Sequence, residues 1–560
     1  MANPVHPWFK NYPEGVPHTV DISEYASLVD LFEQSFARFA DRDAYQYLGK
    51  TMTYRELDLL SKNFADYLLT LGLARGARVA LMLPNMLQFP IAMLGVLRAG
   101  MVVVTVNPLY TPRELQYQLK DSGAEALVIL ENCAHNYEKI MADTAVKHVV
   151  VTSVGEQIGL KGLLVDFVLK HVKKVVPAWC IPGSINFKAA LQQGLSHPMP
   201  ALRPQQDDIA FLQYTGGTTG VSKGAVLLHR NILANVLQVD LWLEPALKKH
   251  PIKQLVFLCA LPLYHIFALT ACGMLGIRKG GLNILVPNPK DLGAFIQLMK
   301  HNPGIHIFPG VNTLFNALIH RPDFADVKFP NLLITIGGGM AVQQSVADAW
   351  KKMTGVPIIE GYGLSETSPV VCVNTALIEK YTGNTGLPVP GTEVTIRGDD
   401  GVESAPGQSG EVCVRGPQVM AGYWNRPEET AASTTSDGYF KTGDIGVMDE
   451  GGYVKLLDRK KDMIVVSGFK VFPYELEDLL GRLPGVLESA VVGIPDPDTG
   501  ESVKVFIVRS DPSLTEQQVL DYCKEQLTNY KRPKHVVFKS ELPKSNVGKI
   551  LRRELRDLSV

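Results

Sequence analysis

The chain has 560 residues, of which 46% are hydrophobic and 20% are charged, and its formal net charge is −1. This length predicts roughly three to four domains, and the composition excludes a disordered, collagen-like or coiled-coil protein. Because 55 lysine and arginine residues nearly balance 56 aspartate and glutamate residues, bulk binding of nucleic acid is not expected.

The seven cysteines are scattered, odd in number and contain no Cys-x-x-Cys pair. This pattern argues against a metal cluster or a disulfide framework and favours a cytoplasmic protein. Residues 1–10 lack the apolar core of a signal peptide. The most apolar windows, Pro90–Val106 and Leu261–Ile277, are interrupted by polar, glycine or proline residues, so we expect buried core elements there and not membrane spans.

The first third of the chain alternates helix and strand signals. Capping boxes at Thr53–Glu56 and Thr111–Glu114 predict two helix starts, the first helix running to Leu73. Between and after them we expect a helix over Leu87–Ala99 and short apolar strands at Val79–Leu83, Val102–Val106, Ala126–Leu130 and His148–Thr152. The alternation returns between Leu255 and Glu360, which predicts parallel or mixed sheets with helices on their faces.

Residues 160–176 form a basic amphipathic segment, which we expect to be a helix. Its apolar face packs on the large domain, the commoner use of such a helix, or it lies on an anionic membrane surface, as a peripheral contact. The apolar face comprises Leu164, Val165, Val168, Leu169, Val172, Val175 and Val176, and the opposite face Asp166, Lys170, Lys173 and Lys174.

The sequence pattern changes from Gly386 to Arg459, where glycine and proline are frequent and short strand signals alternate with turn signals. This stretch predicts a small β-rich subdomain. Beyond it, about 100 residues suffice for a compact domain. Its expected helices are Pro473–Leu483 and Thr515–Leu527, and its expected strands include Ala490–Val492 and Val503–Val508.

The most informative stretch is the loop Tyr214–Gly224, with three threonines, four glycines and a lysine. It follows the apolar run Ile209–Leu212 and precedes a helix-like stretch near His229. Glycine-rich backbone can approach phosphate oxygens closely, so a nucleotide phosphate loop is favoured over a flexible surface loop. The loop lacks the Gly-Lys-Ser/Thr of a Walker A motif. Its candidate phosphate-binding residues are Thr215, Gly216, Gly217, Thr218, Thr219, Gly220 and Lys223.

Through this loop, the chain resembles the adenylate-forming superfamily of acyl-CoA synthetases, luciferases and peptide-synthetase adenylation domains. Asp437–Gly446 looks most like the signature of fatty acyl-CoA synthetases, closest to bacterial long-chain fatty-acid–CoA ligases. The loop differs from that of many relatives at Gly216–Gly217 and Val221–Ser222, so the loop by itself does not assign a subfamily. Five further motifs occur in the family's order: Leu261–His265, Gly361–Thr367, Thr442–Asp444, Asp458–Asp462 and Pro543–Lys549.

The resemblance implies an α/β fold in two unequal parts. A large N-terminal domain, residues 1–460, would hold two parallel or mixed sheet subdomains and the β-rich subdomain at about 386–460. A small, mobile α+β domain, residues 461–560, would follow the hinge at Lys461. It would carry Lys549 in a tail, residues 531–560, that has nine basic and three acidic residues.

The implied reaction joins a fatty acid to CoA at the expense of ATP, through an acyl-adenylate. Both reactants of the first step are anions, so positive charge is needed. By the resemblance, Lys549 bridges the carboxylate and the α-phosphate, and Mg²⁺ is held by Glu366 with Thr215 nearby. Asp444 and Arg459 would bind the ribose. The residues alone also allow Lys549 to be a surface lysine, Glu366 a solvated glutamate and Arg459 a partner in a salt bridge between subdomains.

The remaining site residues are also implied by the resemblance. Tyr362, between Gly361 and Gly363, would stack on adenine, and otherwise is a core tyrosine. Gly338 follows a strand and would let the nucleotide lie close to the backbone, since no GxGxxG supports a dinucleotide site there. His265 is either near the substrate carboxylate or a satisfied core histidine. The acyl pocket would be lined from Ile266–Met274 and Phe308–Phe315, and the CoA-facing residues would be Ser467, Gly468 and Lys470.

Other interpretations stay open at this stage. The thiol acceptor could be a carrier protein, making the chain a fatty acyl-AMP ligase, or the substrate another apolar or aromatic carboxylate. The acyl chain of the fatty-acid substrate is expected to be medium to long. The oligomeric state is open, a homodimer included. The expected location is the cytoplasm, with the inner face of the cell membrane as a peripheral site.

Overall fold

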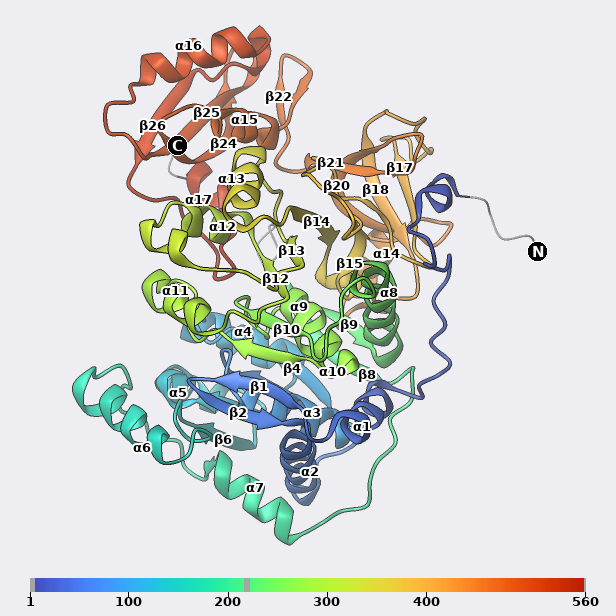
Figure 1. Cartoon of the computed structure of the whole chain (residues 1–560), viewed down its shortest axis with the longest axis vertical. Coiled ribbons are helices and arrows are strands. Elements are labelled where there is room, and N and C mark those ends of the chain that lie inside the picture. The colour runs from blue at the N-terminus through green and yellow to red at the C-terminus, as the bar shows by residue number, and fades with distance from the viewer. Residues whose placement is uncertain (1–5, 216–221, 558–560) are drawn as a thin grey trace.

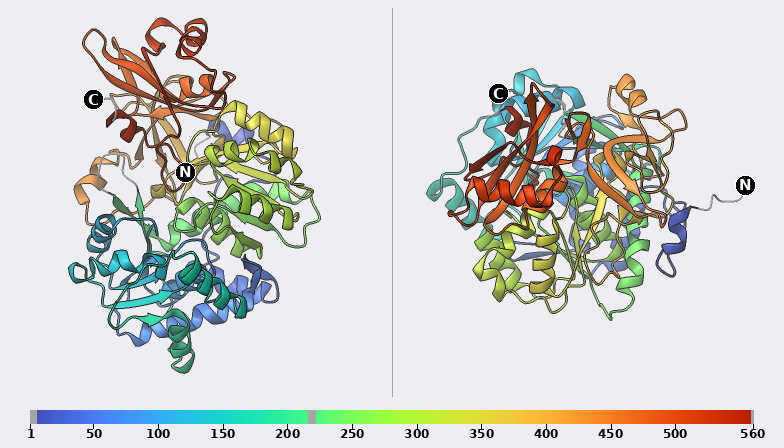
Figure 2. Two further views of the ribbon diagram at one scale, coloured as in Figure 1. Left: turned by 90° about the vertical axis from the view of Figure 1, so that its left-hand side faces the viewer. Right: turned by 90° about the horizontal axis from the view of Figure 1, so that it is seen from above.

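The computed structural model describes residues 6–215 and 222–557 (Figure 1). The described residues form four sheets. Two large sheets lie in the N-terminal two thirds of the chain, a small antiparallel sheet lies beside them, and the fourth sheet organises the C-terminal part. The two further views in Figure 2 show the C-terminal part seated against the end of the larger body. The α/β fold in two unequal parts is therefore confirmed.

The eight-stranded sheet is parallel at its centre, and antiparallel strands complete one edge. Its buried strands are rich in valine, leucine and isoleucine, as expected when helices cover both faces. The strands, in order across the sheet, are β19 (Gly422–Tyr423), β9 (Lys223–Leu228), β8 (Ile209–Thr215), β4 (Val102–Thr105), β3 (Arg78–Met82), β5 (Ala126–Leu130), β6 (His148–Thr152) and β7 (Ile185–Asn186).

Two helices of this half begin where the sequence predicts. Thr53 and Thr111 each accept a hydrogen bond from the backbone three residues on, and the glutamate at that position bonds back. Both capping boxes are thereby confirmed. The helices of this half are α1 (Leu28–Phe39), α2 (Tyr54–Thr70), α3 (Gln88–Arg98), α4 (Pro112–Ser122), α5 (Glu131–Glu138), α6 (Leu160–Phe167) and α7 (Phe187–Ser196).

The nine-stranded sheet is also mixed, with parallel central strands. Trp350, on α13 (Gln344–Thr354), is fully buried and packs its ring against Phe308, Phe315 and Phe324, which ties the helices to this sheet. The strands, in order, are β16 (Leu387–Pro388), β15 (Val370–Val373), β14 (Ile358–Gly363), β13 (Ile334–Gly337), β12 (Ile307–Gly310), β10 (Val256–Cys259), β11 (Leu282–Leu285), β1 (Asp43–Tyr47) and β2 (Lys50–Thr53), and the longer helices around it are α8 (His229–Leu247), α11 (Leu292–His301) and α12 (Asn312–Ile319).

The small antiparallel sheet is built from β17 (Glu393–Arg397), β18 (Gly410–Arg415), β20 (Phe440–Met448) and β21 (Val454–Arg459). It lies where the sequence predicts a β-rich stretch. Its last strand leads directly into the C-terminal part, whose strands are β22 (Ile464–Val466), β23 (Phe469–Val471), β24 (Val486–Asp496), β25 (Gly500–Arg509) and β26 (His535–Lys539), with helices α15 (Pro473–Leu480), α16 (Glu516–Gln526) and α17 (Arg552–Asp557).

The two apolar windows are buried core elements, as expected. The first forms α3 and β4, and the second lies mostly in a buried π-helix, Leu269–Met274, and the helix α10 (Leu275–Lys279). Within residues 6–215 and 222–557, no helix is both long and apolar enough to cross a membrane.

The segment 160–176 differs from both its expected length and its expected packing. It forms α6 (Leu160–Phe167) followed by a π-helix that ends at Val172, so the expectation of one helix to Val176 is wrong. Gly162 packs against the backbone of Gly155, and the Asp166 carboxylate accepts hydrogen bonds from the Gly155 N–H (2.7 Å) and the Ser153 hydroxyl (2.6 Å).

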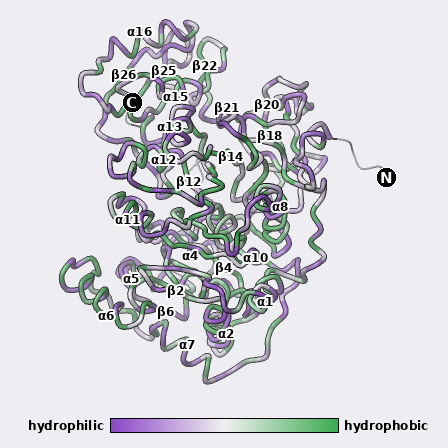
Figure 3. Tube along the Cα trace, viewed as in Figure 1, coloured by the Kyte–Doolittle hydropathy of each residue, from purple (hydrophilic) through white to green (hydrophobic). Residues whose placement is uncertain are grey.

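Because glycine and aspartate occupy the inner face of α6, its large apolar side chains point outward. Leu160, Leu163 and Leu164 are 87%, 70% and 66% exposed, and Phe167 and Val172 are exposed too. Of the predicted apolar face, Leu164, Val172 and Val175 are exposed, so the expectation that this face packs on the domain is wrong for these three residues. Figures 1 and 3 show this projecting segment, with apolar residues in it, at the edge of the molecule.

Candidate active site

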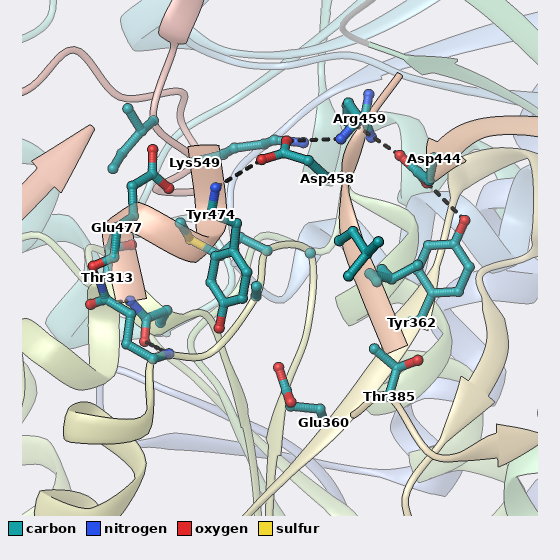
Figure 4. Close-up of a pocket in the computed structure, with 18 of the residues that line it drawn as sticks. Thr313, Glu360, Tyr362, Thr385, Asp444, Asp458, Arg459, Tyr474, Glu477 and Lys549 are labelled. Atoms are coloured by element: carbon teal, nitrogen blue, oxygen red, sulfur yellow. Dashed lines mark hydrogen bonds and ion pairs between the residues drawn. The ribbon is translucent and has the colours of Figure 1, made fainter. Parts of the chain in front are cut away.

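A cavity opens where the segment after β13, strand β14 of the large sheet, strands β20 and β21 of the small sheet, and the C-terminal segment converge (Figure 4). Six residues that the sequence singles out line it. They come from three different parts of the chain, which only the tertiary fold brings together: Gly361, Tyr362, Gly363, Asp444, Arg459 and Lys549.

Tyr362 is held by the end of β14, in a short antiparallel pairing with β15. Its ring is buried, and its hydroxyl donates a hydrogen bond to Asp444 Oδ2 (2.7 Å), while burial raises the pKa of the phenol well above its ordinary value. Gly338 does not line the cavity, because it packs against the Phe267 ring. Its neighbour Gly339, whose φ is +75°, lines the cavity instead.

Asp444 and Arg459 face each other across β20 and β21 as directly paired residues. Arg459 Nε lies 3.3 Å from Asp444 Oδ1, so the carboxylate is held both by this guanidinium and by Tyr362. The pair is formed within one sheet, and the alternative of a salt bridge between subdomains is wrong. The fixed carboxylate lines the cavity, where it could accept hydrogen bonds from two adjacent hydroxyl groups.

Lys549 reaches the cavity from a tight C-terminal loop. The loop is closed by hydrogen bonds from the Ser545 N–H to the Lys549 carbonyl (2.7 Å) and from Thr313 Oγ1, on α12, to the Gly548 carbonyl (2.9 Å). Gly548 has a φ of +82°, and a Cβ there would lie 2.6 Å from Thr313 Oγ1, so glycine is required. Burial and the nearby Arg459 charge lower the pKa of Lys549 to about 8. Figure 4 shows its side chain extending toward Arg459.

Glu366 lies outside the lining of this cavity, in the turn after β14. It is 9% exposed, and burial raises the pKa of its carboxyl group. The Tyr423 hydroxyl donates a hydrogen bond to one carboxylate oxygen of Glu366, Oε1 (2.9 Å). Among the described residues, no three His, Cys, Asp or Glu side chains form a metal cage. A metal held by Glu366 would therefore need most of its ligands from elsewhere.

The two ends of the phosphate loop are described, but Gly216, Gly217, Thr218, Thr219 and Gly220 lie outside the described residues. Thr215 ends β8 and Lys223 begins β9, and the two are paired across this hairpin. Strand β9 was not expected between the loop and α8. The Lys223 ammonium forms an ion pair with Glu429, on α14 (Pro427–Ala432), and lies over the Tyr423 ring. Thr215, Lys223 and Glu366 thus share a neighbourhood through Tyr423 and the end of the hairpin.

His265 is partly buried and caps the short helix α9 (Ile266–Ala268), where its Nδ1 accepts a hydrogen bond from the Phe267 N–H (3.4 Å). Burial, together with the charge of Lys549, lowers the pKa of His265 to about 4, so the ring is neutral at pH 7. The structure therefore gives His265 a structural role as a cap and places it within the electrostatic reach of Lys549.

The expected hinge and CoA-facing residues lie beyond the cavity. Lys461 occupies the turn between β21 and β22, and burial lowers its pKa to about 8. Ser467 and Gly468 form the tight turn between β22 and β23, both with positive φ (49° and 83°). Lys470 is exposed, and its Nζ lies 3.5 Å from Oδ2 of Asp399, in the turn that follows β17 of the small antiparallel sheet.

Several residues of the cavity were missed by the sequence analysis. Glu360 precedes the Gly361 motif on β14 and is buried, which raises its pKa to about 7; a glutamate on an otherwise apolar strand was the available signal. Tyr474, Glu477 and Arg552 also line the cavity. They come from helices of the C-terminal part, and no local pattern marks them.

Comparison with known proteins gives the family. Residues 32–424 match the model of the AMP-binding enzyme family, and residues 475–549 match that of the AMP-binding enzyme C-terminal domain. A long-chain-fatty-acid–CoA ligase of Escherichia coli O157:H7 is 53% identical over 98% of both chains. One of Bacillus subtilis is 37% identical over 98% of this chain and 97% of the other.

Solved structures agree with this assignment. The anthranilate CoA ligase AuaEII, in complex with anthranoyl-AMP, has a TM-score of 0.84 at 25% identity and covers 96% of this chain and 99% of its own. ATP-bound MatB from Rhodopseudomonas palustris has a TM-score of 0.78 at 28% identity, over 95% and 98%. With both family regions matched in order and close relatives along the whole length, the chain belongs to the AMP-binding enzyme family, the adenylate-forming enzymes.

Proposed function

We propose that this protein is an ATP-dependent fatty-acid–CoA ligase for medium to long chains. It converts a fatty acid, ATP and CoA into acyl-CoA, AMP and pyrophosphate through an acyl-adenylate. The main support for this proposal is that Tyr362, Asp444, Arg459 and Lys549 line one cavity. The full-length similarity to long-chain-fatty-acid–CoA ligases supports the substrate class.

The first half-reaction joins two anions, and the cavity supplies the cations. The carboxylate oxygen attacks the α-phosphorus, and pyrophosphate leaves. Lys549 and Arg459 reach this cavity together. In the ligand-free protein, burial and Arg459 lower the pKa of Lys549 to about 8, and negative charge from the nucleotide and the fatty acid would raise it again. The ammonium is thereby charged when both anions are bound.

The nucleotide itself is held by the strands of the two sheets. We assign adenine stacking to Tyr362, with Gly361 and Gly363 allowing close backbone approach, and ribose binding to Asp444 and Arg459. The hydrogen bond from Tyr362 to Asp444 links these two functions, because the residue that stacks also orients the carboxylate. The phosphate loop between Thr215 and Lys223 is assigned to the phosphates.

Magnesium fits the residues that are present. Mg²⁺ commonly binds through one or two protein oxygens, with substrate phosphates and water as its other ligands. Glu366, with Thr215 at the end of the neighbouring strand β8, provides such oxygens, and the Tyr423 hydroxyl holds the carboxylate in place. The bound ion would neutralise phosphate charge. Glu366 is the one carboxylate that we assign as a Mg²⁺ ligand.

The second half-reaction uses the other face of the C-terminal domain. We infer that residues 461–560 rotate about Lys461, so that Lys549 leaves the cavity and the turn at Ser467–Gly468, with Lys470, approaches it. The CoA thiolate then attacks the acyl carbonyl carbon and AMP leaves. The Lys470–Asp399 contact is exposed and would break at low cost. We assign His265 to the carboxylate end of the acyl pocket.

We further infer that the protein contacts the inner face of the cell membrane from the cytoplasm through residues 160–176. The exposed side chains of Leu160, Leu163, Leu164 and Phe167 support this contact, and the exposed Lys170, Lys173 and Lys174 add charge that complements anionic lipid. A water-insoluble substrate would reach the enzyme from such a surface.

Vesicle sedimentation tests the membrane contact. Leu163→Ser/Phe167→Ser should weaken binding to phosphatidylglycerol-containing vesicles at least fivefold, and Lys170→Glu/Lys173→Glu/Lys174→Glu should remove the preference for them over phosphatidylcholine. Leu109→Ser, at another exposed leucine, serves as the control. Equal binding of all variants would exclude this surface.

Pyrophosphate release across a fatty-acid length series, with and without CoA, tests the function. We expect release with medium and long chains and acyl-CoA formation only with CoA. Transfer to a holo-carrier protein but not to CoA would favour the fatty acyl-AMP ligase, and release with aromatic acids alone would favour another acid. No release with any carboxylate would refute the assignment.

A further inference from the structure

A buried arginine that the reaction does not require lies three residues beyond Lys549. Arg552 begins α17, and its guanidinium forms a fork with Glu477, Nε to Oε1 at 3.1 Å and Nη2 to Oε2 at 2.6 Å. Its Nη1 contacts Asp458 Oδ1 at 3.1 Å and lies 3.6 Å from Asp462 Oδ2. The Arg552 and Asp458 side chains are only 18% and 3% exposed, so solvent screens this contact little.

The carboxylates around Arg552 belong to different sides of the hinge. Glu477, on α15, and Asp462 lie after Lys461 and would move with Arg552. Asp458, on β21, lies before Lys461 and next to Arg459. Its second oxygen, Oδ2, accepts a hydrogen bond from the Tyr474 N–H of α15 (2.9 Å). Asp458 is thus bound twice by the C-terminal domain in the arrangement that places Lys549 in the cavity.

The link from Arg552 to Lys549 is short and stiff. The Leu551 N–H donates to the Pro543 carbonyl (2.9 Å) and the Ser545 N–H to the Lys549 carbonyl (2.7 Å), so residues 543–551 form a closed loop that ends at Arg552. A displacement of the guanidinium from Asp458 would therefore displace the loop that carries Lys549.

We propose that Asp458 and Arg552 form a latch across the hinge that holds Lys549 in the nucleotide cavity for adenylate formation. The proposal rests on the fatty-acid–CoA ligase function with two domain orientations. Both latch residues act as positioning residues, through Lys549. When the latch opens, Glu477 and Asp462 remain with Arg552, so the arginine keeps carboxylate partners and its charge is not left buried and unpaired. This lets one ion pair favour one orientation without blocking the other.

Separate measurement of the two half-reactions tests the latch. Asp458→Asn removes the charge on the far side of the hinge and leaves the Arg552–Glu477 fork in place. We expect single-turnover pyrophosphate release to fall about tenfold, as the competent orientation becomes less populated. Thioester formation from synthetic palmitoyl-AMP and CoA should stay within twofold of wild type. Asp496→Asn, which weakens the Lys534–Asp496 pair inside the C-terminal domain, should leave both steps within twofold.

A second measurement is independent of activity. In the ligand-free protein, hydrogen–deuterium exchange of residues 543–551 should rise severalfold in Asp458→Asn and not in Asp496→Asn. Equal loss of both half-reactions, or unchanged exchange in Asp458→Asn, would overturn the latch. A wild-type enzyme that releases no pyrophosphate with fatty acids would overturn the proposed function, and the exchange measurement would still decide whether the latch exists.

Discussion

Replacing Lys549 by methionine should stabilise the ligand-free protein at pH 7 while it removes adenylate formation. Folding lowers the pKa of this lysine to about 8, through burial and the neighbouring Arg459, from about 10.4 in an unfolded chain. At about 1.4 kcal/mol for each tenfold change in proton affinity, the charged lysine costs up to about 3 kcal/mol. The side chain is part exposed, so solvent screening reduces the expected gain to about 2 kcal/mol.

The sign of this effect can be checked with pH. Because the folded pKa lies below the unfolded one, the unfolded wild-type chain binds more protons between about pH 8 and pH 10.4, and wild-type stability rises with pH over this window. Lys549→Met lacks the group, so its advantage should be full below about pH 8 and vanish near pH 10.5. Urea unfolding at several pH values measures it.

The control is Lys544→Met, in the same loop, whose lysine is paired with Glu488 and should confer no such gain. The two half-reactions complete the test. Pyrophosphate release should fall at least a hundredfold in Lys549→Met, and thioester formation from palmitoyl-AMP should persist. A variant no more stable than wild type, or a gain that does not change with pH, would refute the reasoning about the buried charge.

Three further substitutions probe the hinge, the metal ligand and the core. Lys461→Pro should spare adenylate formation and block thioester formation, since proline restricts the backbone rotation; equal loss of both in stopped-flow assays would contradict this. Glu366→Gln should lower adenylate formation about a hundredfold and raise the Mg²⁺ concentration needed for half-maximal rate, whereas an unchanged Mg²⁺ titration would exclude Glu366 as a ligand. Trp350→Ala should destabilise the protein by about 3–5 kcal/mol in urea unfolding, because the fully buried ring packs against several phenylalanines; a loss below about 1 kcal/mol would show that the site repacks.

Local signals were sufficient for many elements of the N-terminal half. The capping boxes at Thr53 and Thr111 predicted helix starts correctly because their hydrogen bonds close within four residues. The apolar strands Ala126–Leu130 and His148–Thr152 have the predicted bounds, since strands buried in a parallel sheet read as short apolar runs. Strand β9 escaped notice because it follows the phosphate loop directly and has no turn residues of its own to separate it from α8.

Packing reversed one prediction that periodicity alone could not decide. The helical pattern of residues 160–176 defines an apolar face, but periodicity does not say which face meets the protein. Gly162 allows close backbone contact and Asp166 finds hydrogen-bond donors on the segment 153–155, so these small and polar residues face inward. The leucines are left outside, and an expected packing helix becomes a candidate membrane contact.

The α/β class, the order of the elements and the residue types that a nucleotide-dependent acid–thiol ligase needs can be predicted from the sequence, because motifs and capping signals are local. Which of these residues meet depends on the tertiary fold. The Tyr362–Asp444 hydrogen bond, the approach of Lys549 to Arg459 and the contact of Arg552 with Asp458 join residues about 80 to 95 positions apart in the chain. Such contacts depend on how sheets and domains pack, and no spacing along the chain encodes them.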